Sequence, residues 1–127
     1  MKLFIFSGKA GPVNFKSDPY GRDEKSHNIE WVAESITKIT NFKLQFREDK
    51  DAYYTENEID VEDPKSWTEI QVNPHENGDH FYLGKHSIQN LKSAQWYQAR
   101  VSSKNDYGYS EFSKPFRFAT KGAGKVF

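Results

Sequence analysis

The sequence predicts an all-β fold, a sandwich of two antiparallel sheets with about seven strands. Hydrophobic and polar residues alternate with a period of two over short runs, and Asn, Gly and Pro clusters separate these runs. No segment sustains a helical pattern over three turns. At 127 residues the chain has the length of one domain. Because aromatic residues make up 16% of the chain, we expect a core rich in Phe, Tyr and Trp.

The strongest strands follow directly from this alternation. They are HNIEWV, NFKLQFR, WYQARVSS and FRFAT, which begin at residues 27, 41, 96 and 116. In each run, every second side chain is expected to point into the core while its neighbours point outward. The predicted inward residues are Ile29, Trp31, Phe42, Leu44, Phe46, Tyr97, Ala99, Val101, Phe116 and Phe118.

An acidic segment interrupts this pattern. Between residues 48 and 63, eight of the 18 acidic residues lie within 16 positions. Repulsion among these carboxylates disfavours a packed element, so we expect a long solvated loop. We further expect that residues 49–63 can be deleted without loss of folding. Residues 1–10 are predicted to be a tail or linker, residues 11–120 the domain and residues 121–127 a second tail.

Composition and motifs argue against several functions. The 18 basic and 18 acidic residues balance, which does not favour nucleic acid as a partner. The chain has no cysteine and no apolar run of membrane-spanning length, so disulfides, thiolate metal sites and direct membrane insertion by this domain are not expected. The polar segment HENGDH, residues 75–80, is interpreted as a hairpin loop, with no metal and no cofactor.

The stretch YGYSEFS, residues 107–113, has two sharper interpretations. Its Gly-x-Ser resembles half of a hydrolase nucleophile elbow, but Glu111 and Phe112 follow where a small residue is needed, so no enzyme is expected. YSEFS also resembles the WSXWS box of cytokine receptors, in which tryptophans stack between arginines. Here Tyr109 and Phe112 replace both tryptophans, and Arg100 is the one arginine expected to point outward from the neighbouring strand. We therefore expect the stack partners to be missing.

The segment IQNLKSAQWYQARVSSKNDYG, residues 88–108, carries the most specific resemblance. Leu91 precedes Tyr97 by six residues, which is the spacing of a tyrosine corner in fibronectin type III domains. Over residues 11–120 the chain resembles this family. The resemblance implies that the Tyr97 phenol hydrogen-bonds to the chain upstream. Further matching positions are Pro12, Phe15, Trp31, Trp67, Asn105, Gly108, Ser110, Ser113 and Thr120.

A narrower resemblance rests on the ending FRFATKGAG and on the acidic segment. Both are similar to the single type III domain that follows immunoglobulin domains in insect neural adhesion proteins of the Klingon and Wrapper kind. This resemblance implies an extracellular location at the cell surface, as part of a membrane-anchored protein. The type III resemblance, together with the lack of an assembled catalytic constellation, implies a non-catalytic extracellular protein-interaction or spacer module of a cell-adhesion or receptor-like protein, with another protein as the partner.

The candidate partner-binding residues are those that alternation places outward on adjacent strands: Lys43, Gln45, Arg47, Arg100 and Arg117. They form either a contact face or a solvated face on which acids such as Glu48 and Glu69 pair with the cations. The alternative function is binding of heparan sulfate through the same cations. Trp96 precedes the inward Tyr97, so it is predicted to be either an exposed contact residue or a residue covered by a neighbouring loop.

Overall fold

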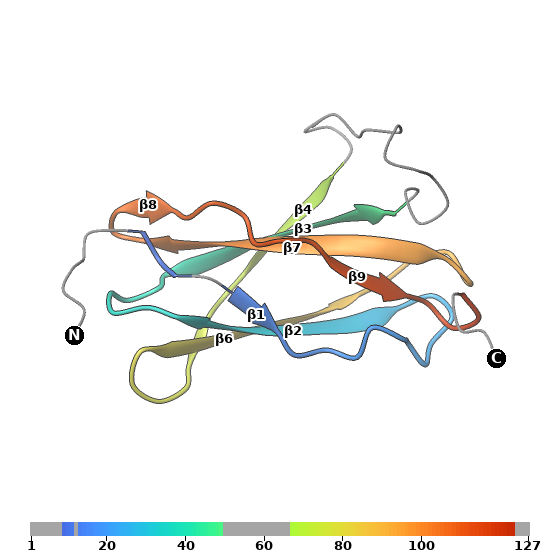
Figure 1. The fold of residues 1–127 in the computed structure, drawn as a ribbon, viewed down its shortest axis with the longest axis horizontal. Coiled ribbons are helices and arrows are strands. Elements are labelled where there is room, and N and C mark those ends of the chain that lie inside the picture. Colours follow the sequence, from blue (N-terminus) through green and yellow to red (C-terminus); the bar gives the residue numbers. More distant parts are fainter. Residues whose placement is uncertain (1–8, 12, 50–66, 124–127) are drawn as a thin grey trace.

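The computed structural model describes residues 9–11, 13–49 and 67–123. These residues form the predicted sandwich of two antiparallel sheets. The first sheet has the order β1-β2-β6-β5, and the second has the order β4-β3-β7-β8 with β9 beside β7 (Figure 1). The strands are β1 (Val13–Phe15), β2 (His27–Glu34), β3 (Asn41–Glu48), β4 (Thr68–Val72), β5 (His75–Glu76), β6 (Phe81–Ile88), β7 (Trp96–Asn105), β8 (Gly108–Tyr109) and β9 (Phe116–Ala119).

The core lies between the sheets and is built from the residues that alternation places inward. Trp31 is fully buried, and its ring meets Phe42 of the opposite sheet edge-on at 5.4 Å. Gly84 is the cross-strand partner of Trp31, and a Cβ at that position would collide with the indole. The glycine therefore makes room for the largest core side chain. Of the ten predicted inward residues, Phe46 and Phe116 are half-buried and pack against the core, and the other eight are buried.

The tyrosine corner has the predicted geometry. The Tyr97 hydroxyl accepts a hydrogen bond of 2.8 Å from the backbone N–H of Lys92. Leu91 is buried, and its own N–H donates to the carbonyl of Lys25 at 2.9 Å. Burial raises the pKa of the Tyr97 phenol, while the bond from Lys92 acts in the opposite direction. The corner thus attaches the segment before β7 to the body of the domain.

The sequence prediction starts the solvated loop at residue 48, which is too early. Glu48 is the last residue of β3, opposite Tyr97, and Asp49 is only 2% exposed. The Asp49 N–H donates to the carbonyl of Trp96 at 2.9 Å, and its carboxylate accepts from Arg117 Nε at 2.5 Å. A cation from another strand therefore allows an acidic residue to be buried, and a deletion that removes Asp49 would break this contact. Residues 50–63 lie outside the described residues.

The connections gather at two ends of the sandwich. One end carries the β2–β3 loop, the turn before β6 and the turn between β7 and β8, at the left of Figure 1. The described segment that leads into β1 approaches the same end, and Ala10 packs against the core. At the opposite end, Ala123 is buried after β9. In the described part of the chain, no helix is long and apolar enough to cross a membrane.

Candidate functional site on the outer face of the second sheet

Four of the five candidate residues lie together on the outer face of the second sheet. Lys43, Gln45 and Arg47 alternate along β3, and Arg100 lies opposite Gln45 on β7. All four side chains are half-buried rather than fully solvated. Alternation correctly places them outside the core, but it does not show what covers them.

The cover is provided by aromatic rings. Trp67, which immediately precedes β4, is 8% exposed, and the guanidinium carbons of Arg47 and Arg100 each lie 4.1 Å from its ring centroid. The Phe112 ring lies 4.3 Å from the same carbon of Arg100, which therefore contacts two aromatic rings. A guanidinium is attracted to the electron-rich face of a ring and is weakly hydrated, so this arrangement suits arginine.

A second group continues the pattern around Tyr109. The ammonium nitrogen of Lys43 lies 4.0 Å from its ring centroid, and that of Lys104 lies 5.6 Å away. The Tyr109 hydroxyl accepts a hydrogen bond from Asn41 Nδ2 at 2.9 Å and donates to Gln71 Oε1 at 3.3 Å. Its ring is thereby fixed across the outer face. We call the two groups together the aromatic–cation ladder: Arg47, Trp67, Arg100, Phe112, Lys43, Tyr109 and Lys104.

Amide side chains fix the arginines from the sides. Arg100 Nε donates to Gln45 Oε1 at 2.9 Å, and Arg47 Nε donates to Gln98 Oε1 at the same distance. Gln45 Nε2 in turn donates to the carboxylate of Glu69 at 2.9 Å. The stacked guanidinium groups therefore also have directional hydrogen bonds, which restrict their rotamers.

Two serines attach the segment that carries Phe112 and Tyr109 to β7. The Ser110 N–H donates to the carbonyl of Ser103 at 2.8 Å, and Ser110 Oγ accepts from the N–H of Ser103 at 3.0 Å. Ser113 makes the same pair of bonds with Val101, at 2.9 Å and 3.0 Å. The side-chain oxygens take the place of backbone carbonyls, so the segment follows β7 without forming a regular strand.

The expectation that the stack partners are missing is therefore wrong. It counted Arg100 alone on β7. The ladder also takes Lys104 from the end of β7, Lys43 and Arg47 from β3, and Trp67 from before β4. In YSEFS, Tyr109 and Phe112 do occupy positions between or beside cations. The sequence signal was the spacing of these two aromatic residues around Ser110, and the partners become visible only with the strand pairing.

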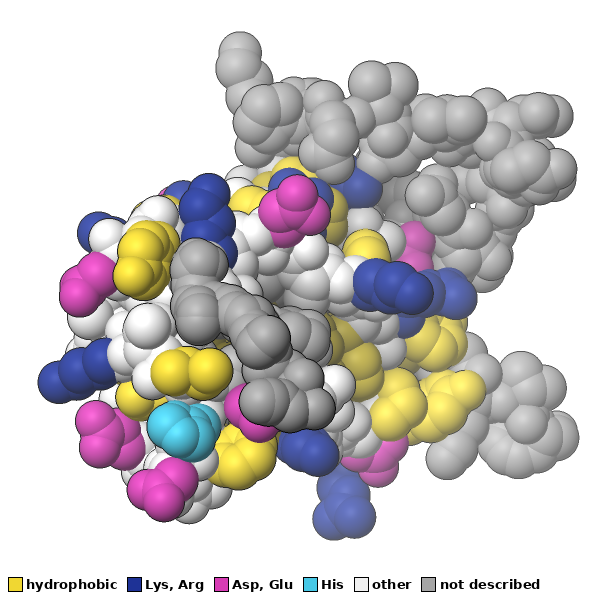
Figure 2. Space-filling model, turned by 60° about the vertical axis from the view of Figure 1, so that its left-hand side comes forward, with side chains coloured by type: hydrophobic (Ala, Val, Ile, Leu, Met, Phe, Trp, Pro, Cys, Tyr) yellow, Lys and Arg dark blue, Asp and Glu magenta, His cyan; other side chains and the backbone are white. Residues whose placement is uncertain are grey.

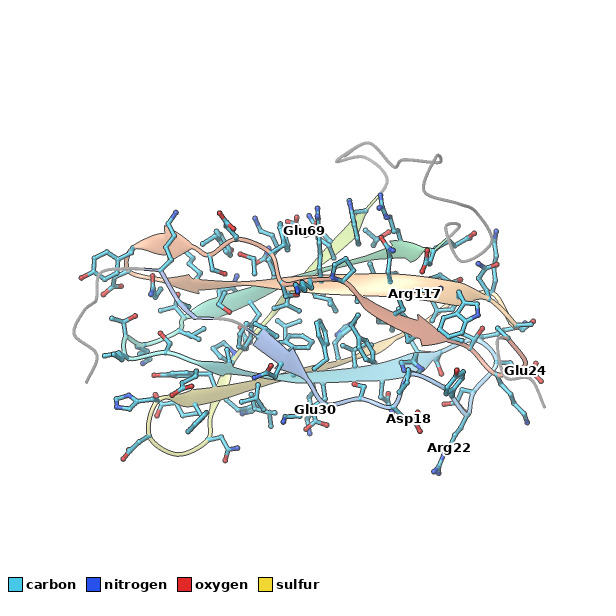
Figure 3. The ribbon with its side chains drawn as sticks, viewed as in Figure 1. Asp18, Arg22, Glu24, Glu30, Glu69 and Arg117 are labelled. Carbon is cyan, nitrogen blue, oxygen red and sulfur yellow. The ribbon has the colours of Figure 1, made fainter. Side chains whose placement is uncertain are left out.

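Arg117, the fifth candidate, belongs to a separate cluster. It lies on β9 beside Gln98, pairs with the buried Asp49, and its guanidinium carbon lies 5.0 Å from the ring centroid of Trp96. Tyr20 meets Trp96 edge-on at 5.8 Å, so the half-buried Trp96 is partly covered by the connection before β2. Figure 3 shows Arg117 by β9, to the right of the centre of the view, and Glu69 on the outer side of the second sheet.

The two acids expected to neutralise the face have other contacts. Glu69 accepts from Gln45, and Glu48 forms a salt bridge of 2.9 Å with Lys92. This contact with Glu48 raises the pKa of Lys92, whose ammonium is exposed. Stacking on a ring attracts a cation but does not cancel its charge. No group of three or more His, Asp or Glu residues in the described ranges is placed to hold a metal ion.

Comparisons with known proteins agree with this architecture. The family model of the fibronectin type III domain matches residues 12–119, and the chain belongs to this family. Such domains are typically non-catalytic modules that mediate protein interactions or act as spacers. No curated protein matches the chain.

Similar solved structures show the same fold at low sequence identity. A structure described as a myokine has 16% identity and a TM-score of 0.59, with 90% of this chain and 99% of that chain covered. The sixth type III domain of the human fibronectin type III domain containing protein 3 has 17% identity and a TM-score of 0.54, with 95% and 96% covered. Astrotactin-2, a perforin-like vertebrate membrane protein involved in neuronal development, has 14% identity and a TM-score of 0.55, with 85% and 22% covered.

Proposed function

We propose that this domain is a protein-interaction module of an extracellular cell-adhesion or receptor-like surface protein, and that its contact surface is the aromatic–cation ladder. The observation that carries the proposal is the fixed geometry of the cations. Arg100 lies between two rings and donates to Gln45, and Lys43 lies over Tyr109. Side chains that are already ordered lose little conformational entropy on binding, which favours affinity.

The residue types also fit a binding surface. Arg, Trp and Tyr are enriched among the residues that contribute most to protein–protein affinity. In the ladder they lie side by side, and the exposed Lys104 and Gln71 border them. A partner with acidic groups that reach the cations and an apolar edge that meets the rings would complement this surface. The finer proposal of a neural, membrane-anchored protein of the insect Klingon and Wrapper kind is supported by the chain ending and the acidic segment.

A cell-binding experiment tests the proposal. Fluorescent tetramers of the domain are added to cultured neural cells and measured by flow cytometry. Changing Lys43 and Lys104 to Gln should reduce binding at least about tenfold with an unchanged melting temperature, because the lysines contribute charge rather than core packing. The matched control changes Lys16 and Lys85, two exposed lysines of the first-sheet side, to Gln. Equal binding by both double variants would refute the ladder as the contact surface.

Heparan sulfate is the second candidate, favoured by the two ammonium groups that converge on Tyr109 from β3 and β7. A sulfated polymer would bind such closely spaced cations with a strong dependence on salt. Retention on a heparin column at about 0.15 M salt, lost in the Lys43 and Lys104 variant, would support this candidate. Passage straight through the column, with cell binding that survives heparinase treatment, would exclude heparan sulfate and support a protein partner.

A further inference from the structure

The two most exposed large hydrophobic side chains in the described part of the chain lie at one end of the sandwich. Ile36 in the β2–β3 loop is 75% exposed, and Tyr107 in the turn between β7 and β8 is 57% exposed. Phe81, 42% exposed, begins β6 at the same end, where the Ser35 N–H donates to the carbonyl of His80 at 2.8 Å. In Figure 2, which turns this end toward the viewer, hydrophobic side chains lie among charged ones.

Buried polar residues fix the positions of Ile36 and Tyr107. Asn105 is 2% exposed, and its Nδ2 donates to Thr37 Oγ1 at 2.7 Å, which joins the two loops. The Asn105 Oδ1 accepts from the N–H of Tyr107 at 2.8 Å. On the other side of Ile36, the buried Ser35 donates its hydroxyl to the carbonyl of Thr37 at 2.7 Å. The exposed side chains therefore project from ordered turns. We call Ile36 and Tyr107 the knobs.

A groove with apolar walls lies beside this end. It is lined by residues 9–11 and 110–114, and its apolar lining residues include Val13, Val101 and Phe112. Lys9, Glu111 and Lys114 also line it and give its polar part a net positive charge. The Lys9 side chain reaches Gly108, the residue after Tyr107, since a Cβ at Gly108 would lie 4.0 Å from Lys9 Cε.

We propose that this end of the domain binds a second copy of the chain, with Ile36 and Tyr107 of each copy inserted in or against the groove of the other. Knob and groove are adjacent on one molecule, so a single two-fold axis can satisfy both contacts at once, as an isologous interface requires. Charge complementarity supports this occupant: the exposed Asp106 next to the Tyr107 knob would meet the positive edge that contains Lys114. Phe112 borders both surfaces, but Ile36, Tyr107, Asp106 and Lys114 lie outside the aromatic–cation ladder, so the proposal extends the proposed function to self-association.

Sedimentation velocity of the full chain tests self-association without any other partner. We expect a monomer–dimer equilibrium between about 5 and about 500 µM protein. Changing Ile36 and Tyr107 to Ser should weaken the dimer at least about tenfold, because such central apolar side chains dominate interface affinity. Tyr20→Ser at the opposite end is the matched control and should leave the dissociation constant unchanged. A wild-type chain that stays monomeric, or a dimer that the double variant retains, would overturn the proposal.

A charge exchange tests the predicted orientation. Asp106→Lys alone and Lys114→Glu alone should each weaken self-association, since each places like charges together twice in the symmetric dimer. Mixed in equal amounts, the two variants should form a heterodimer with wild-type affinity, because both of its contacts then join opposite charges. Failure of the mixture to associate, while both variants keep the wild-type melting temperature, would show that the knob and the groove do not meet.

Discussion

Tyr107 and Tyr109 are two residues apart, and yet they lie in opposite environments. Tyr109 is half-buried, has an ammonium 4.0 Å from its ring centroid, and uses its hydroxyl in two hydrogen bonds. Tyr107 is 57% exposed at the tip of its turn. The difference shows that an aromatic side chain outside the core takes its role from its neighbours. Because β3 and β7 supply cations around Tyr109, its ring is part of the packing on the sheet. The ring of Tyr107, at the turn, remains exposed and available for contact.

Removing Trp67 is the strongest test of this comparison. We expect Trp67→Ala to lower the free energy of unfolding by about 3 kcal/mol, because a large buried ring and two stacked guanidinium groups lose their contacts. Tyr107→Ala should change it by less than about 0.5 kcal/mol. Urea denaturation of both variants measures the two values. Similar values for the two would remove the distinction between ladder and exposed end.

The tyrosine corner provides a reference for a single hydrogen bond. Tyr97→Phe removes the acceptor of the Lys92 N–H while keeping the ring in place, so it should cost about 1–3 kcal/mol. The denaturant slope should stay unchanged, since the same surface is buried. A variant with the wild-type urea midpoint would mean that water replaces the Tyr97 hydroxyl as the acceptor of the Lys92 N–H without loss of stability.

The coupling between Arg100 and Phe112 sharpens the comparison further. A double-mutant cycle with Arg100→Gln and Phe112→Leu should give an interaction free energy of about 0.5–1 kcal/mol, the value expected for a partly exposed cation and ring at 4.3 Å. The same cycle on Arg100 and Tyr107 is the control and should give no coupling. Additive effects for the first pair would show that the contact between Arg100 and Phe112 contributes no net coupling to stability.

His27 shows how burial reverses the preference for a cation beside a ring. It stacks on Phe118 with centroids 4.5 Å apart, it is 5% exposed, and Nε2 lies 3.0 Å from the carbonyl of Asp18. Burial lowers the pKa of His27, although Asp18 and Asp23 act in the opposite direction. The unfolded chain therefore takes up the proton first, and stability should be lost as the pH falls below 6.5 and level off below the folded-state pKa.

Unfolding curves in urea between about pH 7.5 and about pH 5 measure this effect, which we expect to be smaller than that of Trp67→Ala. The comparison is with His27→Gln, which cannot titrate, and with His75→Gln as an exposed control. A pH dependence that persists unchanged in His27→Gln would assign it to other groups.

The parts of the fold that could be predicted depend on local sequence. The alternation in β2, β3 and β7 places Trp31, Leu44 and Val101 in the core without knowledge of any partner strand. The spacing from Leu91 to Tyr97 likewise predicts a contact between neighbouring segments. Both signals arise because side-chain direction along a strand is fixed by the backbone itself.

The parts that could not be predicted depend on distant segments. All five candidate site residues were correctly placed outside the core, but the stacking of Arg47 and Arg100 on Trp67 requires the register of β4 against β3. Asp49 was assigned to a solvated loop on the density of acidic residues, yet Arg117, 68 positions later, makes its burial favourable. The exposure of Ile36 has no sequence signal, since isoleucine is most often buried.

The buried Asp49 and the stacked Trp67 also have a practical consequence for protein engineering. Asp49 directly follows β3 and Trp67 directly precedes β4, its antiparallel neighbour, so the two residues flank residues 50–66. Each of them is held to the body of the domain by its own contacts. The ends of any intervening segment are thus held whatever its sequence, and each doubling of its length should cost only about 0.6 kcal/mol of closure entropy. The site between them is therefore suited to the insertion of foreign peptides, including epitopes or whole binding loops, into a domain that already folds without them.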